Sequence, residues 1–596
     1  EYTISNLMHM ENMVMGIAFG TAVTLFWNRV SENFKGTYHY VQYKHIKNDH
    51  PYVFPDRDYR YSEIHQNQFK KIPGCLIAYS ASTTFMPILQ TKDRLEKYID
   101  LTGSQHKTAK NEKYLRCFWE IDINKLGIGW ITYAKGGAFR KWWGNLQLVV
   151  DWSENAQEFY KKNNTSNMLK DEYRFRQGIT WTATTNNMFS ARILPDSGLF
   201  DIKGPALFVD DDLEYYLGIL NSVAIYYILK LLKSGSDYQN IEIKNLPMVN
   251  FDENTKRIIK NLACEAISIS KQDWETSEAS LEYDTTLYIP DNTNNQLESI
   301  FDKMKKKQKI RFNRLKSIEE EINYYTINAY GLEDEVSPLV EEKYISINLF
   351  DDEEMVKNFL SYAVGCIFGR YSVGERGVAF AGGRFNSDKY SSFIPNNENI
   401  LLVTDREYHS NDIVRRLEDF LENVYGKDSL EINLNYIGNT LRKNSGTPRE
   451  VIRNYFLNDF YDDHLKKFQK RPIYWLLDSG KNNGFKAFIY MHRYNEDTLG
   501  KVRVNYLHEI QKVYERTILN LQDNMSHSKD AKEISQIQKN IEKIIKQLKE
   551  CKDYDLLIGH MAIERIAIDL DDGVKINHLK VQTDSKRKIH QILANI

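Results

Sequence analysis

The sequence contains few prolines and has almost equal numbers of positive and negative side chains. Each of these two features excludes a class of protein. Only 12 of its 596 residues are proline, well below the usual share of about 5%, which argues against long proline-rich linkers. Lys and Arg total 79 against 81 Asp and Glu. No general basic coat for nucleic acid therefore covers the chain, although a local basic face is still possible.

Cysteine is scarce and dispersed. The five cysteines lie far apart and form no C-x-x-C pair: Cys75, Cys117, Cys264, Cys366 and Cys551. A structural zinc site needs about four clustered Cys or His ligands, so no cysteine-based zinc site is expected. A disulfide framework is not expected either, and the cytoplasm is the predicted location.

Long apolar runs are also missing. The longest run, residues 13–27, is shorter than the roughly 20 residues that a membrane-spanning helix needs, and it lacks the basic flank of a secretion signal. We therefore predict no membrane contact. Hydrophobic residues make up 42% and charged residues 27% of the chain, which is ordinary for globular proteins. The length suggests about three or four domains.

The first half of the chain is predicted to be mixed. Residues 1–45 have the pattern of a strand at 19–27, a loop at 28–36 and a strand at 37–43, and we expect them to complete a sheet that begins elsewhere. Residues 46–250 combine short apolar runs with turn signals and are predicted to form a mixed α/β domain. Residues 213–232 within it have the composition of a single helix, buried on most of its circumference.

The second half is predicted to be largely helical. Residues 251–360 are expected to be a helical spacer, and 361–499 a mixed α/β domain that opens with glycine-rich strands and turns at 361–400. In residues 500–596, apolar side chains step by three and four along two segments separated by a polar break at 522–530. This spacing predicts a long antiparallel helical hairpin followed by a C-terminal tail. The predicted fold class is multi-domain α+β.

Catalytic signatures are scarce. No Walker loop is present, and Gly127-Ile-Gly129 is a lone glycine pair. Asp196, Asp201 and Lys203 are superficially similar to a nuclease core, in which two carboxylates hold a metal that activates water. The two aspartates are five positions apart, which is a tight spacing for two strands. A nuclease is therefore kept only as an alternative hypothesis.

One stretch differs clearly in charge and aromatic content. Residues 101–180 carry 13 Lys and Arg against 8 Asp and Glu, and six of the nine tryptophans lie between 119 and 181. At its centre is Tyr133-Ala-Lys-Gly-Gly-Ala-Phe-Arg-Lys-Trp-Trp-Gly-Asn145. Cationic side chains and exposed amides suit phosphate contacts, and aromatic rings can stack on bases. The alternative is that the tryptophans are core residues and the lysines form a solvated rim.

Several segments carry a resemblance to a known family. They are 133–145, Phe175-Arg-Gln-Gly-Ile-Thr-Trp181, Leu217-Gly-Ile-Leu-Asn-Ser222, Asn245-Leu-Pro247, Ser361-Tyr-Ala-Val-Gly-Cys-Ile-Phe-Gly-Arg-Tyr371, Lys470-Arg-Pro-Ile-Tyr-Trp475 and Gly484-Phe-Lys-Ala-Phe-Ile-Tyr-Met-His-Arg-Tyr494. With these segments, the chain resembles the C-terminal part of the PglX family, the adenine-specific DNA methyltransferases of bacterial BREX phage-defence systems. The segments run through most of the chain.

The chain departs from that family at the catalytic motifs. Such enzymes use an Asn-Pro-Pro-Tyr-type loop, whose aromatic ring stacks on the flipped adenine, but no two prolines are adjacent in this sequence. The glycine-rich loop for S-adenosylmethionine is missing too, and both motifs would lie upstream of Glu1. The resemblance thus implies a target-recognition and C-terminal portion that holds no cofactor itself and does not methylate alone. S-adenosylmethionine would serve the full-length enzyme.

The resemblance also implies a site and partners. Residues 46–250 would be the target-recognition domain, and its expected DNA-contacting residues are Lys135, Arg140, Lys141, Trp142, Arg174, Arg176 and Lys203. No catalytic or metal-binding residue is expected. The implied partners are double-stranded DNA, other BREX-system proteins and phage-encoded inhibitors that mimic DNA. A competing hypothesis is an assembly module with little DNA affinity, which holds partner proteins through the hairpin at 500–550.

Overall fold

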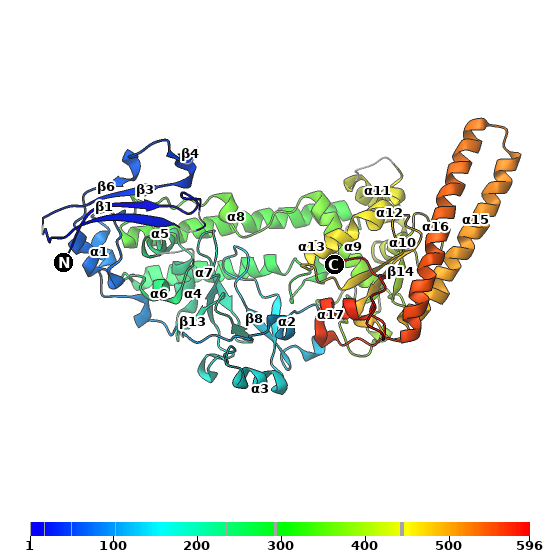
Figure 1. The fold of residues 1–596 in the computed structure, drawn as a ribbon, viewed down its shortest axis with the longest axis horizontal. Helices are drawn as coiled ribbons and strands as arrows, with labels where there is room; N and C mark the ends of the chain where they lie inside the picture. Colours follow the sequence, from blue (N-terminus) through cyan, green and yellow to red (C-terminus); the bar gives the residue numbers. More distant parts are fainter. Residues whose placement is uncertain are drawn as a thin grey trace.

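Small sheets and long helices follow one another along the long axis of the molecule (Figure 1). The computed structural model describes all residues except 1, 17, 19, 32, 49, 102, 234–236, 291–294 and 442–445. A sheet formed near the N-terminus lies at one end, and a pair of long helices projects from the other end. The predicted class, multi-domain α+β with a largely helical C-terminal region, is confirmed.

The first sheet has the strand order β2-β1-β3-β6. Its strands are β1 (Thr3–Met10), β2 (Thr21–Trp27), β3 (Thr37–Val41) and β6 (Arg60–Tyr61), while β4 (Ile46–Lys47) and β5 (His50–Pro51) form a separate ribbon. The strands expected at 19–27 and 37–43 are confirmed as β2 and β3, with residue 19 outside the described residues; β1 was not predicted. The outer strand β2 exposes the apolar side chains of Val23, Leu25 and Phe26.

Two sheets form the central lobe, which comprises residues 101–212. One sheet has the order β12-β8-β9-β7 and the other β11-β10-β13. Their strands are β7 (Leu115–Cys117), β8 (Trp130–Ala134), β9 (Leu148–Asp151), β10 (Gly178–Trp181), β11 (Ala191–Leu194), β12 (Gly198–Phe200) and β13 (Ala206–Leu207), with α3 (Glu154–Lys162) beside them. Because β8 and β12 are parallel and pair Ala134 with Phe200, the loops that follow them leave the same edge of the sheet.

The single helix predicted at 213–232 is two helices, α4 (Leu213–Leu220) and α5 (Val223–Leu232). The side chain of Asn221 accepts from the backbone N–H of Ala191 and donates to its carbonyl, and Ser222 caps α5. These bonds stabilise a break that the apolar pattern did not predict. No single described helix is long and apolar enough to span a bilayer; α4 and α5 pass that test only together, with a bend of 67° between them.

One long helix, α8 (Leu297–Tyr330), connects the two halves of the molecule. The long helices before and after it are α7 (Glu253–Trp274) and α9 (Asp352–Phe368), and the shorter α1 (Met86–Leu89), α2 (Asn111–Tyr114) and α6 (Asn240–Lys244) lie earlier in the chain. Phe312, Leu315 and Ile318 of α8 pack into the N-terminal core, whereas Leu297 and Phe301 pack into the C-terminal core. Helix α8 therefore belongs to both cores.

Helix α9 corrects the strand and turn character expected at 361–400. It continues to Phe368, and the residues after it form turns, bends and one short 3-10 helix (Ser387–Lys389) up to the short strand β14 (Ile400–Leu402). Every residue from Phe359 to Phe368 is buried, so the run lacks the one-sided pattern that identifies a surface helix. The predicted boundary at 360 thus lies within α9, and that at 499 lies within the short helix α14 (Thr498–Lys501); the division into domains stays a prediction.

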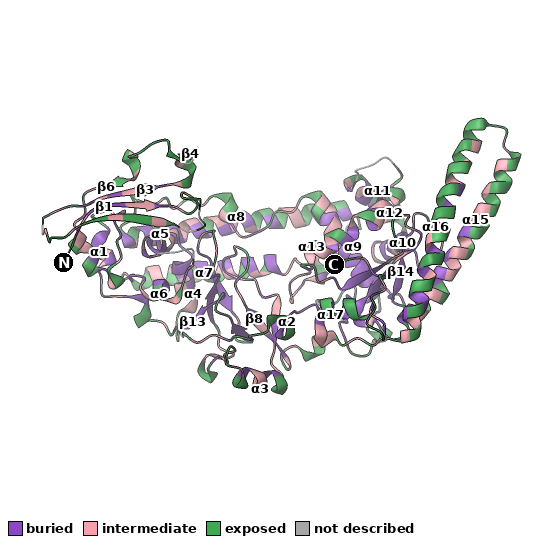
Figure 2. Ribbon diagram, in the orientation of Figure 1, coloured by how far each residue is buried: buried purple, intermediate pink, exposed green. Residues whose placement is uncertain are grey.

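The C-terminal part is built on a sheet with the order β14-β16-β15. Its elements are β14 (Ile400–Leu402), α10 (Ile413–Tyr425), α11 (Leu430–Thr440), α12 (Pro448–Asn458), α13 (Phe460–Lys467), β15 (Tyr474–Asp478), β16 (Lys486–Tyr490), α14 (Thr498–Lys501), α15 (His508–His527), α16 (Ala531–Glu564) and α17 (Gly573–Lys580). Helices α15 and α16 form the predicted antiparallel hairpin. Figure 2 shows exposed residues along its projecting part, and buried residues near its base.

Candidate nucleic-acid interface

Two lysines of the predicted site meet at the edge of the sheet where β8 and β12 end. Lys135 Nζ lies 3.1 Å from Asp201 Oδ2, and the Tyr133 hydroxyl donates to the same oxygen at 2.8 Å. The other oxygen of Asp201 accepts from the backbone N–H of Lys203 at 2.8 Å. Lys203 Nζ in turn donates to Thr184 Oγ1 at 2.8 Å. The Lys203 ammonium also lies 3.7 Å from Asp237 Oδ2. Asp201 therefore holds the ammonium group of Lys135 and the backbone of Lys203.

Glycines allow these two loops to touch backbone to backbone. Gly136 has φ +79°, and a Cβ there would lie 2.7 Å from the carbonyl oxygen of Lys203. A Cβ on Gly204 would lie 2.6 Å from the amide nitrogen of Gly136. Gly137 has φ +124° and is exposed, a conformation that is accessible almost only to glycine. The close approach of the two loops therefore requires glycine at positions 136 and 204.

A buried cation lies beneath this contact. Arg192 on β11 is fully buried and donates from Nη2 to the Gly136 carbonyl at 2.9 Å and from Nη1 to Thr182 Oγ1 at 3.3 Å. No acidic side chain in the described part of the chain forms an ion pair with it. Burial, with the nearby cation of Arg140, lowers its pKa to about 10. Arg192 therefore stays charged at neutral pH and adds positive potential under the loop.

A second group of cations flanks an exposed aromatic ring. Phe175 is 44% exposed and has φ +54°. Arg174 lies over the ring of Trp152, with its guanidinium carbon 5.4 Å from the ring centroid, and pairs with Asp171. On the other side of Phe175, Arg176 forms ion pairs of 2.9 Å with Asp100 and 3.1 Å with Asp210. The sequence-based site omitted Phe175, although its place between two arginines was a usable signal.

One cation of each group, Lys135 and Arg174, acts on a buried residue, His106. The Tyr133 hydroxyl lies 2.8 Å from the carbonyl oxygen of His106 as well, so its one proton is shared between this oxygen and Asp201. The His106 imidazole contacts Trp152 with ring centroids 5.3 Å apart. Burial lowers the pKa of His106 to about 4; Asp201 opposes this shift, and the cations of Arg174 and Lys135 add to it. The imidazole of His106 thus interacts electrostatically with one cation from each group. We call Lys107, Lys135, Arg174, Phe175, Arg176 and Lys203 the basic surface.

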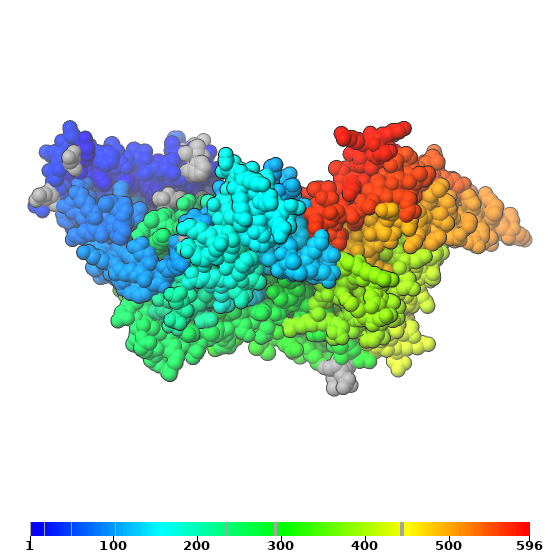
Figure 3. All heavy atoms as spheres, turned by 90° about the horizontal axis from the view of Figure 1, so that it is seen from below, coloured from blue at the N-terminus to red at the C-terminus, as the bar shows by residue number. Residues whose placement is uncertain are grey.

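In the space-filling view, the central lobe that carries the basic surface stands out from its face of the molecule. Figure 3 shows its cyan atoms between the N-terminal part in blue and the C-terminal tail in red. Two further exposed lysines, Lys161 and Lys162, end α3 in the same lobe. The lobe is therefore accessible to a large ligand on this side.

Three residues of the predicted site lie in the interior instead. Lys141 Nζ lies 2.7 Å from Glu319 Oε2, and Trp142 Nε1 donates to Glu319 Oε1 at 2.8 Å; all three side chains are buried. Arg140 pairs with Asp273 at 2.9 Å, and both are also buried. These side chains fasten the loop after β8 to α8 and α7. We therefore do not retain Arg140, Lys141 and Trp142 as DNA contacts.

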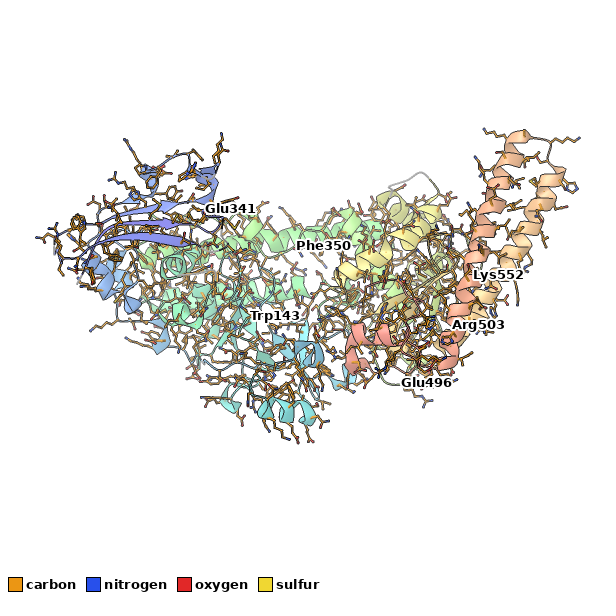
Figure 4. The ribbon with its side chains drawn as sticks, in the orientation of Figure 1. Trp143, Glu341, Phe350, Glu496, Arg503 and Lys552 are labelled. Atoms are coloured by element: carbon orange, nitrogen blue, oxygen red, sulfur yellow. The ribbon has the colours of Figure 1, made fainter. Side chains whose placement is uncertain are left out.

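The tryptophans of this stretch are mainly core residues, as the alternative interpretation held. Four of the six are buried: Trp119, Trp130, Trp142 and Trp181. Trp143, labelled in Figure 4, is partly buried, and Lys271 Nζ lies 4.8 Å from its ring centroid. Phe175, rather than a tryptophan, is the exposed ring beside the cations.

The nuclease alternative finds no support in the geometry. Asp196 lies in the exposed turn before β12, whereas Asp201 directly follows that strand. At about 3.3 Å per residue, the strand holds the two carboxylates at opposite ends. Asp201 is already engaged by Tyr133 and Lys135. Among the described residues, neither aspartate belongs to a group of three side chains that could hold a metal ion.

The chain is similar in sequence to two known methyltransferases. It is 36% identical over 559 residues to adenine-specific methyltransferase PglX of Lacticaseibacillus casei (strain Zhang), a match that covers 89% of this chain and 46% of that protein. It is 32% identical over 559 residues to adenine-specific methyltransferase BrxX of Escherichia coli O9:H4 (strain HS), over 86% of this chain and 45% of that protein. The chain thus spans a little under half the length of both relatives. No protein-family model matches it.

Proposed function

Because the chain is homologous to a little under half of the adenine-specific methyltransferases PglX and BrxX, we propose that it is the DNA-recognition portion of such an enzyme. In this role it binds duplex DNA and specifies the adenine that the complete enzyme modifies. The observation that carries the proposal is the basic surface, to which four separate segments of the chain contribute cations, with Lys135 held beside Asp201 and Arg176 beside Asp100.

The loops after β8 and β12 suit the phosphate backbone. Lys135 and Lys203 provide two ammonium groups at one sheet edge, and Gly137 leaves the neighbouring backbone exposed. Phosphate contacts come from lysine, arginine and backbone N–H groups, and they position a protein on the duplex. The buried charge of Arg192 increases the attraction without reaching the DNA.

The segment around Phe175 suits contact with bases. An exposed ring between two arginines can stack on a base or enter a groove, while arginine can read guanine through two hydrogen bonds. In the free protein, the guanidinium groups are held by Asp171, Asp100 and Asp210. These exposed carboxylates keep the arginines extended until DNA phosphates or base edges replace them.

The catalytic steps belong to the remainder of the full-length enzyme in this proposal. That part would bind S-adenosylmethionine and hold the flipped adenine, since the present chain has no adjacent prolines for an Asn-Pro-Pro-Tyr loop. The exposed apolar side chains of Val23, Leu25 and Phe26 on the edge strand β2 suit packing against such a domain. The basic surface would also accept an acidic phage protein that imitates DNA.

Fluorescence anisotropy on duplex DNA tests the proposal. Removing both loop lysines, in Lys135→Ala with Lys203→Ala, should weaken binding at least about tenfold and reduce the slope of log K against log salt by about 1.8, at roughly 0.9 per phosphate contact. A matched control is Lys532→Ala with Lys539→Ala, which removes two exposed lysines from α16. Equal affinity of both double variants, or no DNA binding by the unaltered chain and by the full-length enzyme, would refute it.

A second candidate function, assembly with other proteins of the BREX system, is favoured by the hairpin. Its helices project from the body and expose Leu519 and Ile545, apolar residues on its outer surface. Replacing residues 518–539 by a short Gly-Ser linker removes the tip and leaves the buried seam at Ile541 and Ile544. Loss of co-purifying BREX proteins with unchanged DNA affinity would assign assembly to the tip of the hairpin with Leu519, whereas unchanged co-purification would exclude the tip.

A further inference from the structure

Two histidines and an aspartate meet where the C-terminal tail reaches the base of the hairpin. His560 lies near the end of α16, whereas Asp584 and His590 lie in the segment that follows α17. Glu496 and Arg503, both labelled in Figure 4, precede α15 and mark the base of the hairpin, where Arg503 pairs with Asp555 of α16 at 2.8 Å. The site is distant in sequence from the basic surface and has no part in the proposed recognition of DNA.

The three side chains converge on one oxygen atom. His590 Nε2 lies 2.8 Å and His560 Nε2 lies 3.2 Å from Asp584 Oδ2. The two imidazole rings have centroids 4.6 Å apart, and the potential ligand atoms of the three residues all lie within 4.8 Å of one another. This spacing resembles that of ligands around a tetrahedral metal ion at about 2.0–2.2 Å, and small side-chain rotations would complete it.

The backbone holds the aspartate in place for this purpose. Its second oxygen, Asp584 Oδ1, accepts the N–H groups of Lys586 at 3.0 Å and Lys588 at 2.8 Å. A β-bridge between Thr583 and Ile589 closes the same turn and brings His590 beside Asp584. Oδ2 is thereby left to face the imidazoles. Hydrogen bonds that orient a ligating carboxylate in this way are typical of metal sites.

We propose that His560, Asp584 and His590 form a binding site for a divalent transition-metal ion, with zinc as the preferred ion. Each imidazole binds through the Nε2 lone pair in the tautomer that carries its proton on Nδ1, and the carboxylate binds through Oδ2. Two nitrogen donors and one oxygen donor suit zinc and its neighbours, whereas magnesium and calcium prefer oxygen alone. Asp584 is buried while His560 is half exposed, so water has access to a fourth position.

The ion would fasten the end of the chain to the hairpin. Beyond His590, the backbone of Ala594 donates to Leu476 on β15 at 2.8 Å, and the Tyr554 hydroxyl on α16 donates to the Ile592 carbonyl at 2.7 Å. The tail therefore already contacts both the C-terminal sheet and α16. A metal bond from α16 to the turn at 584–590 would cross-link these elements, and binding to the folded state alone stabilises it.

Calorimetric titration of the chelator-treated full chain with zinc chloride, and with magnesium chloride as a comparison, tests the proposal. We expect one bound zinc ion per chain, a higher Tm with zinc and no magnesium binding. Cobalt(II) should show the visible absorption of a four-coordinate site. His560→Ala should weaken zinc binding at least about 100-fold, since loss of a ligand exceeds the 10–100-fold cost of losing a supporting residue.

His527→Ala is the matched control. His527 lies on the same hairpin with its imidazole 3.7 Å from Asp523, but outside any group of three ligating side chains in the described part of the chain. This variant should bind zinc as the unaltered chain does. Because the His560 side chain is half exposed, His560→Ala should keep its metal-free Tm. Absence of saturable zinc uptake, or equal uptake by His560→Ala, would mean that the three residues form a hydrogen-bonded cluster only.

Discussion

The ammonium group of Lys141 lies 2.7 Å from a carboxylate oxygen of Glu319, and both side chains are buried. Glu319 also accepts from the indole of Trp142. Two residues from the most basic and aromatic segment of the sequence are thus joined to α8. The loop after β8 owes its position to these contacts, and the cations left at the surface are Lys135 and its neighbours.

Lys141→Ala should destabilise the protein without a specific effect on DNA binding. It leaves the Glu319 carboxylate buried without its ion pair, which typically costs about 3–5 kcal/mol. Lys141→Met with Glu319→Gln should recover most of this loss, because the amide still accepts from Trp142. Urea unfolding measures both changes. Weaker DNA binding by Lys141→Ala at unchanged stability would instead support a direct contact of Lys141 with DNA.

Gly136→Ala should displace the two loops of the basic surface. An added Cβ would lie 2.7 Å from the Lys203 carbonyl oxygen, and φ at this position is +79°. We expect a loss of stability of about 1–3 kcal/mol together with weaker DNA binding. Gly500→Ala is the control, since no atom lies within 4 Å of its Cβ and it lies in the helix α14, where alanine is favoured. Equal thermal stability of both variants would contradict this account of the loops.

Phe175→Ala should weaken DNA binding by about 1–3 kcal/mol, the range found for loss of one stacked base. Phe175→Trp should restore most of the affinity, because a larger ring can also stack. Ile128→Ala provides a control in the same lobe, since its side chain is 79% exposed but lies outside the basic surface. Anisotropy titrations at one fixed salt concentration compare the three. An effect of Ile128→Ala as large as that of Phe175→Ala would argue against stacking.

Acid should destabilise the protein through buried histidines. Burial lowers the pKa of His106 to about 4 and that of His492 to about 3, from 6.5. Between about pH 4 and 6.5 the unfolded state therefore binds more protons, and the free energy of unfolding falls as the pH falls. Each histidine should contribute about 2 kcal/mol of this loss between pH 6.5 and 5.

Urea midpoints measured at several pH values test this dependence. In the variant His106→Leu, the free energy of unfolding should depend less steeply on pH, because one of the two histidines that take up a proton on unfolding is gone. Leucine suits the site because neither ring nitrogen of His106 has a hydrogen-bond partner among the described residues. An unchanged slope in this variant would mean that His106 binds its proton in the folded state as readily as in the unfolded state.

The sequence pattern alone was sufficient to predict those helices and strands whose residue types repeat within a short stretch of chain. The apolar steps along 507–521 and 534–548 were sufficient to predict the hairpin, since α15 and α16 pack against each other. Tyr514 in this series also contacts Tyr408 and Gly484 outside the hairpin. Strands β2 and β3 were recognisable from their runs of β-branched and aromatic residues. The shared segments likewise indicated the methyltransferase relatives, because sequence similarity depends on residue identity and needs no coordinates.

Only the tertiary structure decided which cations of a basic segment are exposed. Lys135 and Lys141 are six residues apart and alike in sequence, yet one lies at a sheet edge and the other faces Glu319, 178 positions away. The bend after α4 depends on Asn221 and Ala191, and the histidine cluster on a meeting of α16 with the tail. In each case the deciding contact is between residues far apart in the chain, and periodicity carries information about neighbours alone.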